Sequence, residues 1–334
     1  MKKYDRRHFV LKTLIQTASL SALSSCGKQP ESGPPKVRIA IGGAQQLLYL
    51  PATLAERLEH YKDAGLDVTL ESFPGGSKAL EALMGGSADV VCGFYDHVIQ
   101  MRAEGRKLIG FVLLTQFPGI VLAAMPGKAT SIESLKGKTI GVTAPGSSTH
   151  LLLNYLLNRK GLAATDVSTI GIGAAATAVA AVEKGQVDAA MLTEPALSEL
   201  LSRSQLQILA DTRTGTGVQR DLGVSSYPAA SLYASEDWLN KNADTAHRLA
   251  GAMRNTLAWI DSHTSTKIAE AMPPEYLGPS KERYIASLEA SRAMYSPDGK
   301  WTTEGAGAVK AVLELSMEKV KAAAVDVEQT YRNE

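Results

Sequence analysis

The chain has 334 residues, enough for two domains that each bury a full hydrophobic core. Its apolar share of 45% and charged share of 21% are typical of an ordinary soluble globular protein. A net charge of +1 argues against a nucleic-acid-binding protein, because such a protein needs a broad basic face.

The first 26 residues are organised as an export signal. A basic segment precedes an apolar stretch from Phe9 to Leu23, which is too short and too often interrupted by polar residues to span a membrane. Residues 27–36 follow as a flexible tether rich in Gly and Pro. We therefore expect residues 1–26 to direct export and the folded part to begin near Val37.

Leu23-Ser24-Ser25-Cys26 resembles the lipobox of bacterial lipoproteins, in which the cysteine is lipidated and becomes the new N-terminus. The resemblance implies a protein that is periplasmic or on the outer face of the cytoplasmic membrane, anchored by lipid at Cys26. A plain cleaved signal peptide with an incidental Cys26 is the alternative. Asp5–Phe9 resembles the twin-arginine export motif but has Asp before the arginines, so the general secretory route is open as well.

The first lobe is predicted to consist of residues 37–127 and 227–334. Apolar runs at 37–41, 68–73, 89–94, 108–114 and 120–125 predict strands, with helices between them. Because strands alternate with helices of about ten residues, the sheet is expected to be mostly parallel. Cys92 lies in one of these runs, which indicates a small core residue.

The second lobe is predicted at residues 128–226. Strands are expected at 139–143, 168–170, 189–192 and 207–209, and residues 213–227 are expected to return the chain to the first lobe. A strand at 229–234 follows. Helices at 243–262, 280–295 and 303–331 are expected to pack on the first lobe.

A repeat about 99 residues apart supports this division. Gly86–Asp89 and Gly185–Asp188 each precede an apolar run, and each run leads into a polar segment that starts a helix, at Tyr95-Asp96 and at Thr193–Pro195. A unit written twice predicts two similar α/β lobes. Small molecules bind in clefts between such lobes.

The loops that follow the strands are the candidate binding segments, because ligands bind beyond the carboxyl ends of the strands in open α/β sheets. These loops are rich in Gly, Ser, Thr and Gln, and Lys78 is the only Lys or Arg in them. Gly146–Thr149 is the best candidate, since four donors are expected at the positive end of a helix; ordinary helix capping is the alternative. A monoanion, a zwitterion or a neutral heterocycle is therefore expected.

Asp96 and Glu194 occupy matching places in the repeat. Either carboxylate has two interpretations from the sequence. It accepts N–H groups from a ligand, or it caps the helix that it begins.

The stretch from Val37 to Trp238 resembles the nitrate/taurine/aliphatic-sulfonate family of ABC-transporter substrate-binding proteins. The resemblance is carried by Tyr49–Pro51, Gly86–Asp89, Tyr95–His97, Leu135–Val142, Gly146–His150, Gly185–Asp188 and Thr193–Pro195. It implies a two-lobed periplasmic-binding-protein-like α/β fold (type II), monomeric and without cofactor or metal. Such a protein closes on its ligand by hinge motion and delivers it to a membrane permease.

The resemblance also implies which residues line the cleft and what they bind. The ligand is expected to be a small organic anion or zwitterion of the sulfonate type, with a neutral pyrimidine or aromatic compound as the alternative. The implied ligand-binding residues are Gln45, Gln46, Gly76, Ser77, Tyr95, Asp96, Ser147, Ser148, Thr149, Thr193 and Glu194.

Two enzyme-like interpretations are weaker. One branch of the superfamily makes a thiamine pyrimidine, but with a cysteine-rich motif that this chain does not contain, so we predict a protein that is not an enzyme. Gly171–Ala176 fits a dinucleotide fingerprint, yet no acidic residue follows at the expected distance on a clear strand. Close packing of a helix on a sheet is the preferred explanation.

Overall fold

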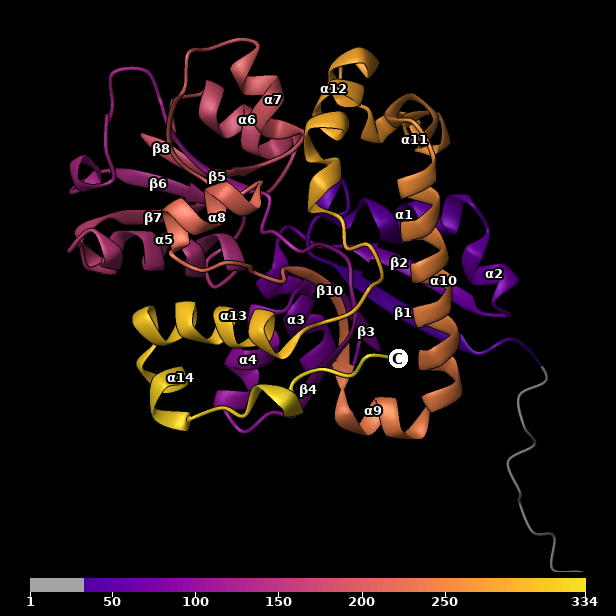
Figure 1. Ribbon diagram of the computed structural model, residues 1–334. Coiled ribbons are helices and arrows are strands. Elements are labelled where there is room, and N and C mark those ends of the chain that lie inside the picture. Colours follow the sequence, from indigo (N-terminus) through magenta and orange to yellow (C-terminus); the bar gives the residue numbers. More distant parts are fainter. Residues whose placement is uncertain (1–32) are drawn as a thin grey trace, which may run out of the picture. The chain divides into compact units, whose positions relative to one another are not determined.

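The computed structural model describes residues 33–334, so the predicted export signal, Cys26 and most of the tether lie outside the described residues. The described part forms two five-stranded sheets flanked by helices (Figure 1). This architecture confirms the predicted two-lobed α/β fold.

The sheet of the first lobe has the order β2-β1-β3-β10-β4. β1 pairs in parallel with β2 and β3, whereas β10 is antiparallel to both β3 and β4. Its strands are β1 (Lys36–Ile41), β2 (Asp67–Ser72), β3 (Val90–Phe94), β4 (Leu108–Leu113) and β10 (Ala230–Ser235).

The sheet of the second lobe repeats this arrangement in the order β7-β6-β8-β5-β9. β6 pairs in parallel with β7 and β8, and β5 is antiparallel to β8 and β9. In each lobe, the antiparallel strand is the one that enters from the other lobe. The strands are β5 (Ile120–Ala124), β6 (Thr139–Val142), β7 (Ser168–Gly171), β8 (Ala189–Thr193) and β9 (Gln207–Asp211).

The first crossing between the lobes lies earlier than predicted. Residues 120–124 were expected in the first lobe, but β5 hydrogen-bonds to β8 and β9 of the second. The boundary therefore falls between Leu113 and Ile120, not at residue 127. The physical reason is pairing: the fully buried β5 has β8 on one side and β9 on the other, and the polar segment after Gly127 is a connection within the second lobe.

Helices cover both sheets. The first lobe has α1 (Leu50–Arg57), α2 (His60–Asp63), α3 (Gly76–Met84) and α4 (Asp96–Ala103). The second lobe has α5 (Ser148–Arg159), α6 (Ala176–Glu183), α7 (Ala196–Leu201) and α8 (Gly215–Leu222). α8 lies in the segment that was predicted only as a crossing; Thr214 caps it by accepting a hydrogen bond from the Gly217 N–H.

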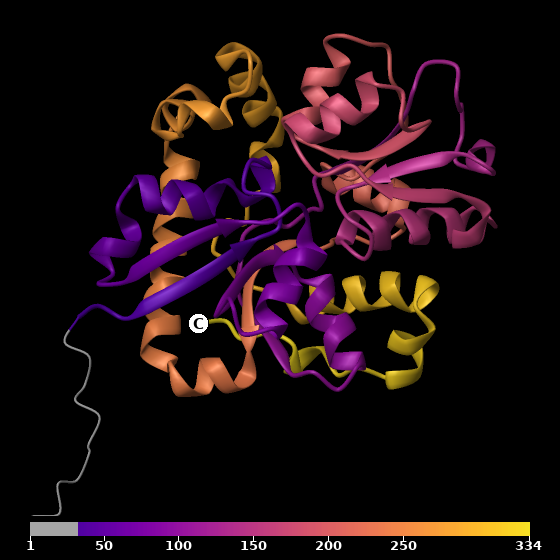
Figure 2. The same cartoon turned by 180° about the vertical axis from the view of Figure 1, so that it is seen from behind.

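The C-terminal third is helical, as predicted: the helix at 243–262 has the predicted bounds, whereas those predicted at 280–295 and 303–331 are shorter, and the helices contact both lobes. The predicted helix at 303–331 is broken at Met317, whose backbone is extended. α13 packs against α4 of the first lobe and α5 of the second, and α12 contacts α7, whereas α10 packs along α1 and α2 (Figures 1 and 2). These helices are α9 (Glu236–Lys241), α10 (Ala243–Ser262), α11 (Ser265–Ala271), α12 (Lys281–Ser291), α13 (Thr303–Ser316) and α14 (Glu318–Ala323). Within residues 33–334, no helix combines the length and apolarity that crossing a membrane requires.

Candidate functional site

The loops at the carboxyl ends of the parallel strands of both sheets meet in the middle of the molecule. They enclose a cavity of about 10 Å³, which holds about one water molecule. The lobes are thus closed on each other. The lining residues are Gly42, Gln46, Leu48, Tyr49, Gly76, Phe94, Ile120, Thr143, Ser147, Ser148, Thr149 and Thr193.

Ser77 and Ser147 hold the two lobes together at one side of the cavity. The Ser77 N–H donates to Ser147 Oγ at 3.0 Å, and the Ser77 hydroxyl donates to the Pro145 carbonyl at 3.0 Å. The two hydroxyl oxygens lie 3.1 Å apart, so the proton between them comes from Ser147. Gly75 permits this approach, since a Cβ atom there would lie 2.8 Å from Ser147 Oγ.

Gln46 and Thr193 join the lobes at the opposite side. The Thr193 hydroxyl donates to Gln46 Oε1 at 2.8 Å, while Gln46 Nε2 donates to the Gly42 carbonyl at 2.7 Å. The Leu47 N–H donates to the Glu194 carbonyl at 3.0 Å. Both side chains are buried, so their hydrogen bonds are made with protein groups, namely each other and the Gly42 carbonyl.

Asp96 is the buried carboxylate of the site. It begins α4, it is 1% exposed, and its Oδ1 accepts a hydrogen bond from the Ser148 hydroxyl at 2.7 Å across the interface between the lobes. Burial raises the pKa of Asp96, whereas its neighbour His97 and the hydrogen bond from Ser148 act in the opposite direction. The next residue, His97, packs behind Gly76, where a Cβ would lie 3.1 Å from His97 Nε2.

The start of α5 follows from the Pro145-Gly146 turn. Gly146 has φ +80°, a conformation that favours glycine, and its N–H donates to His150 Nδ1 at 2.9 Å. Burial lowers the pKa of His150, which favours the neutral ring that this hydrogen bond requires. The Ser147 N–H donates to Ala144. Two of the four predicted donors are therefore used within the loop, and the N–H groups of Ser148 and Thr149 remain at the positive end of the helix.

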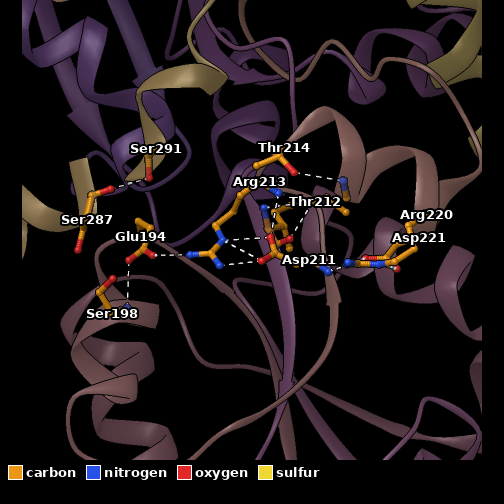
Figure 3. A network of polar contacts seen from close by, with 12 residues as sticks. Glu194, Ser198, Asp211, Thr212, Arg213, Thr214, Arg220, Asp221, Ser287 and Ser291 are labelled. Carbon is orange, nitrogen blue, oxygen red and sulfur yellow. Dashed lines mark hydrogen bonds and ion pairs between the residues drawn. The ribbon is translucent and has the colours of Figure 1, made fainter. Parts of the chain in front are cut away.

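Glu194 lies beside the cavity in an ionic network with Arg213 and Asp211 (Figure 3). Its Oε1 is 3.2 Å from Arg213 Nη1, and its Oε2 accepts a hydrogen bond from the Ser198 N–H at 3.0 Å. Arg213 also binds Asp211 with Nε and Nη2, at 3.0 and 2.7 Å. Burial raises the pKa of Glu194, although Ser198 and Arg213 stabilise its charged form. Its carboxylate therefore caps α7 and neutralises Arg213.

A family model described as NMT1/THI5 like matches residues 49–265. The chain belongs to the NMT1/THI5-like family. Among its solved relatives, a protein from Bordetella bronchiseptica RB50 is 39% identical with a TM-score of 0.87, covering 90% of this chain and 95% of that one.

Three curated relatives of this NMT1/THI5-like chain have informative names. YtlA of Bacillus subtilis (strain 168), named a binding protein, is 27% identical over 83% of this chain and 81% of its own length. An Escherichia coli (strain K12) protein named for binding aliphatic sulfonates is 29% identical, over 67% and 68%. A 4-amino-5-hydroxymethyl-2-methylpyrimidine phosphate synthase of Uromyces fabae is 23% identical, over 68% and 66%. The matches confirm the resemblance that the sequence predicts.

The structure of this NMT1/THI5-like protein brings most of the predicted residues to the cavity. Gln46, Gly76, Ser147, Ser148, Thr149 and Thr193 line it, and Ser77 and Asp96 contact lining residues. Three predicted side chains point elsewhere. Tyr95 turns into the core of the first lobe, where its hydroxyl meets Thr330; Gln45 faces a neighbouring hollow of about 280 Å³ between α6, α7 and α12; and the Glu194 carboxylate faces Arg213.

Several residues at the site were missed from the sequence. Thr143 follows β6 directly, and its N–H donates to Thr149 Oγ1 at 3.1 Å, so the rule that ligands bind beyond strand ends was sufficient to find it. Phe94 packs edge to face on Tyr49 at 6.4 Å, which only the fold reveals. Ile120 was missed because β5 was assigned to the other lobe. Gly171, in the Gly171–Ala176 motif, packs closely on Pro145, since a Cβ there would lie 3.2 Å from the Pro145 ring.

Proposed function

We propose that this protein is the solute-binding component of an ABC importer. It captures a small organic anion or zwitterion of the sulfonate type between its lobes and delivers it to a membrane permease. The observation that carries this proposal is a cavity between the lobes, lined by strand-end loops of both. A protein built in this way holds its ligand only when the lobes are closed, so closure reports that the ligand is bound.

Capture exchanges contacts between the lobes for contacts with a ligand. In the closed molecule, the hydroxyls of Ser147, Ser148 and Thr193 bind groups of the opposite lobe, and the cavity holds no more than about one water molecule. A ligand enters after the lobes separate, and it then takes over these hydroxyls. Each hydrogen bond to the ligand contributes about 1 kcal/mol net, so several of them together give reversible binding.

The location and assembly of the protein belong to the same proposal. We propose that it is exported, is held at the membrane by lipid on Cys26, and acts as a monomer beside its permease. The export signal predicted in residues 1–26 supports this location, and so do the binding-protein names of the Escherichia coli and Bacillus subtilis relatives. Mass spectrometry of the protein from membranes tests the anchor: a diacylglyceryl adduct on Cys26 is expected, and an unmodified cysteine contradicts it.

A neutral pyrimidine or aromatic ligand is the second candidate. Tyr49 and Phe94 line the cavity and pack on each other, and an aromatic pair provides a surface on which a flat ring stacks. The Uromyces fabae relative is named for pyrimidine chemistry. We nevertheless propose binding without turnover, which incubating purified protein with the bound compound tests: the compound is expected to be recovered unchanged.

A thermal-shift screen tests the proposed function. The compounds are taurine, other alkanesulfonates, nitrate, pyrimidines and aromatic acids, each added to the purified protein. A ligand that binds only the folded form raises Tm, by mass action. At least one compound is expected to raise Tm in a saturable way. If none does, the proposed function is wrong.

Removing two hydroxyls at the start of α5 is expected to weaken binding. The double variant Ser147→Ala, Ser148→Ala loses two hydrogen-bonding groups of the cavity, so the affinity should fall by about 2 kcal/mol, or about 30-fold. Isothermal titration with the best compound of the screen measures it. Ser262→Ala, which removes an exposed hydroxyl from α10, is the matched control and should leave affinity unchanged. Equal affinity of the double variant and the wild type contradicts the assignment.

A further inference from the structure

Asp96 is a buried carboxylate whose charged form is stabilised by its neighbour His97 and by Ser148, but by no Lys or Arg of the described residues. None of the ion pairs within residues 33–334 includes it, and its side-chain hydrogen-bond donor in this part of the chain is the Ser148 hydroxyl. The residues that line the cavity include no Lys or Arg. A carboxylate buried in this way is costly unless something compensates its charge.

The hydroxyl protons around the cavity are almost all in use. Ser77 donates to Pro145, Ser147 to Ser77, Ser148 to Asp96 and Thr193 to Gln46. Among the Ser and Thr hydroxyls of the described cavity, one of the two protons shared between Thr143 and Thr149 is uncommitted. A ligand therefore competes for these hydroxyl protons with acceptors of the protein itself. Asp96 is the strongest of these acceptors, because within residues 33–334 it is the one buried carboxylate that accepts a hydrogen bond from a hydroxyl lining the cavity.

These contacts discriminate between ligands. If a purely anionic ligand takes the Ser148 hydroxyl, Asp96 loses its side-chain donor, keeps only the contribution of His97, and faces a second negative charge in a buried site. If the ligand brings an N–H group, that group replaces Ser148 at Asp96 and compensates the carboxylate. The Ser148 hydroxyl is then released, and the N–H groups of Ser148 and Thr149 at the start of α5 receive the anionic end of the ligand.

We propose that Asp96 determines specificity, selecting a short zwitterion whose protonated amine binds the Asp96 carboxylate while its anionic group lies at the start of α5. This inference rests on the proposed function and narrows its ligand class, from a small organic anion or zwitterion to a zwitterion alone. It also gives Asp96 a role that the matching residue of the other lobe does not have, because the Glu194 carboxylate is already bound by Arg213 and Ser198.

Two pairs of probes that differ only in amine against hydroxyl test the proposal. The pairs are taurine with isethionate and β-alanine with 3-hydroxypropionate. Their affinities are measured by isothermal titration on the wild type and on Asp96→Asn, which keeps the shape of the side chain and removes its charge. In the wild type, the amine of at least one pair is expected to bind at least 10-fold more tightly than its hydroxyl partner. In Asp96→Asn, this preference is expected to fall to about 2-fold or less.

Glu133→Gln is the matched control, since it removes a carboxylate that is exposed and far from the cavity, and it should preserve the wild-type preference. The comparison within the wild type does not depend on any variant folding. Equal or tighter binding of the hydroxyl compounds to the wild type overturns the proposal, and so does an unchanged preference in Asp96→Asn. If none of the four probes binds but nitrate, a pyrimidine or an aromatic acid raises Tm, the zwitterion class is wrong and the proposed function stands. If no compound binds at all, the proposed function itself fails.

Discussion

Replacing Gly75 by threonine is expected to prevent ligand capture while both lobes remain folded. A Cβ atom at this position would lie 2.8 Å from Ser147 Oγ, 3.0 Å from Thr143 Oγ1 and 3.1 Å from Ala144 Cβ, and all three belong to the other lobe. The side chain would therefore act as a wedge between the lobes. Gly75 is extended (φ −173°), so threonine fits the backbone, and its hydroxyl suits the position before α3.

The effect on binding should be large because closure is needed for every contact across the cleft. An affinity loss of about 100-fold, or about 2.7 kcal/mol, is expected from isothermal titration with the best compound of the screen. Small-angle scattering should show that the variant keeps its radius when ligand is added, whereas the wild type contracts. Gly251→Ala is the control, because a Cβ atom there meets nothing within 4 Å. Wild-type affinity in Gly75→Thr would mean that the ligand binds outside this cleft.

Replacing Arg213 by alanine is expected to destabilise the second lobe by about 3 kcal/mol. Arg213 binds two carboxylates, and the Glu194 side chain is only 3% exposed. Removing one partner of a buried pair leaves the other charge uncompensated, which typically costs 3–5 kcal/mol. The lower end applies here because Arg213 is 25% exposed. Urea denaturation at pH 7 measures the loss, with Arg248→Ala as the control, since its partner Asp244 is exposed and that pair is worth less than about 1 kcal/mol.

The pH dependence of the Arg213→Ala effect has a definite sign. Burial raises the pKa of Glu194, so this group contributes stability at low pH that is lost as pH rises through its folded-state pKa. Without Arg213, the pKa rises further and the loss at pH 7 is greater. Burial also raises the pKa of Asp211, but the hydrogen bonds from Arg213 outweigh it and the net pKa is lowered, so Asp211 contributes stability at neutral pH that is lost in acid.

For both carboxylates, we therefore expect the difference in free energy of unfolding between wild type and Arg213→Ala to shrink as pH falls from 7 towards about 4.5. Adding Glu194→Gln to the variant should restore part of the stability at pH 7, because the uncharged amide has less to lose by burial. A difference that grows in acid, or a double variant less stable than Arg213→Ala, would show that the network does not act through charge.

Much of the fold was predictable because local sequence patterns indicate most strands of each lobe. Apolar runs bounded by Gly and Pro marked the strands, and the repeat of Gly86–Asp89 as Gly185–Asp188 marked β3 and β8 as equivalents. The position of β5 was not predictable in this way. Its five apolar residues suit a central strand of either sheet, and only the pairing with β8 and β9 decides between them.

The site was predictable as far as backbone position determines it. Ser147 and Ser148 lie where the loop after β6 enters α5, and Thr193 ends β8, so the rule that ligands bind beyond strand ends identified them. Side-chain direction was not available from the sequence. Tyr95 also follows a strand, yet it turns inward beside Trp301, and Arg213 reaches Glu194 from a segment with no recognisable pattern.

The exchange of strands between the sheets has a consequence for the order in which the molecule assembles. Within the sheet of the first lobe, β4 pairs only with β10, which is made after the whole of the second lobe. All five strands of the second lobe lie between Ile120 and Asp211, so that sheet is complete while the first still lacks its fourth member. The second lobe can therefore fold first. The first lobe, whose synthesis began earlier, completes its sheet only when β10 is added.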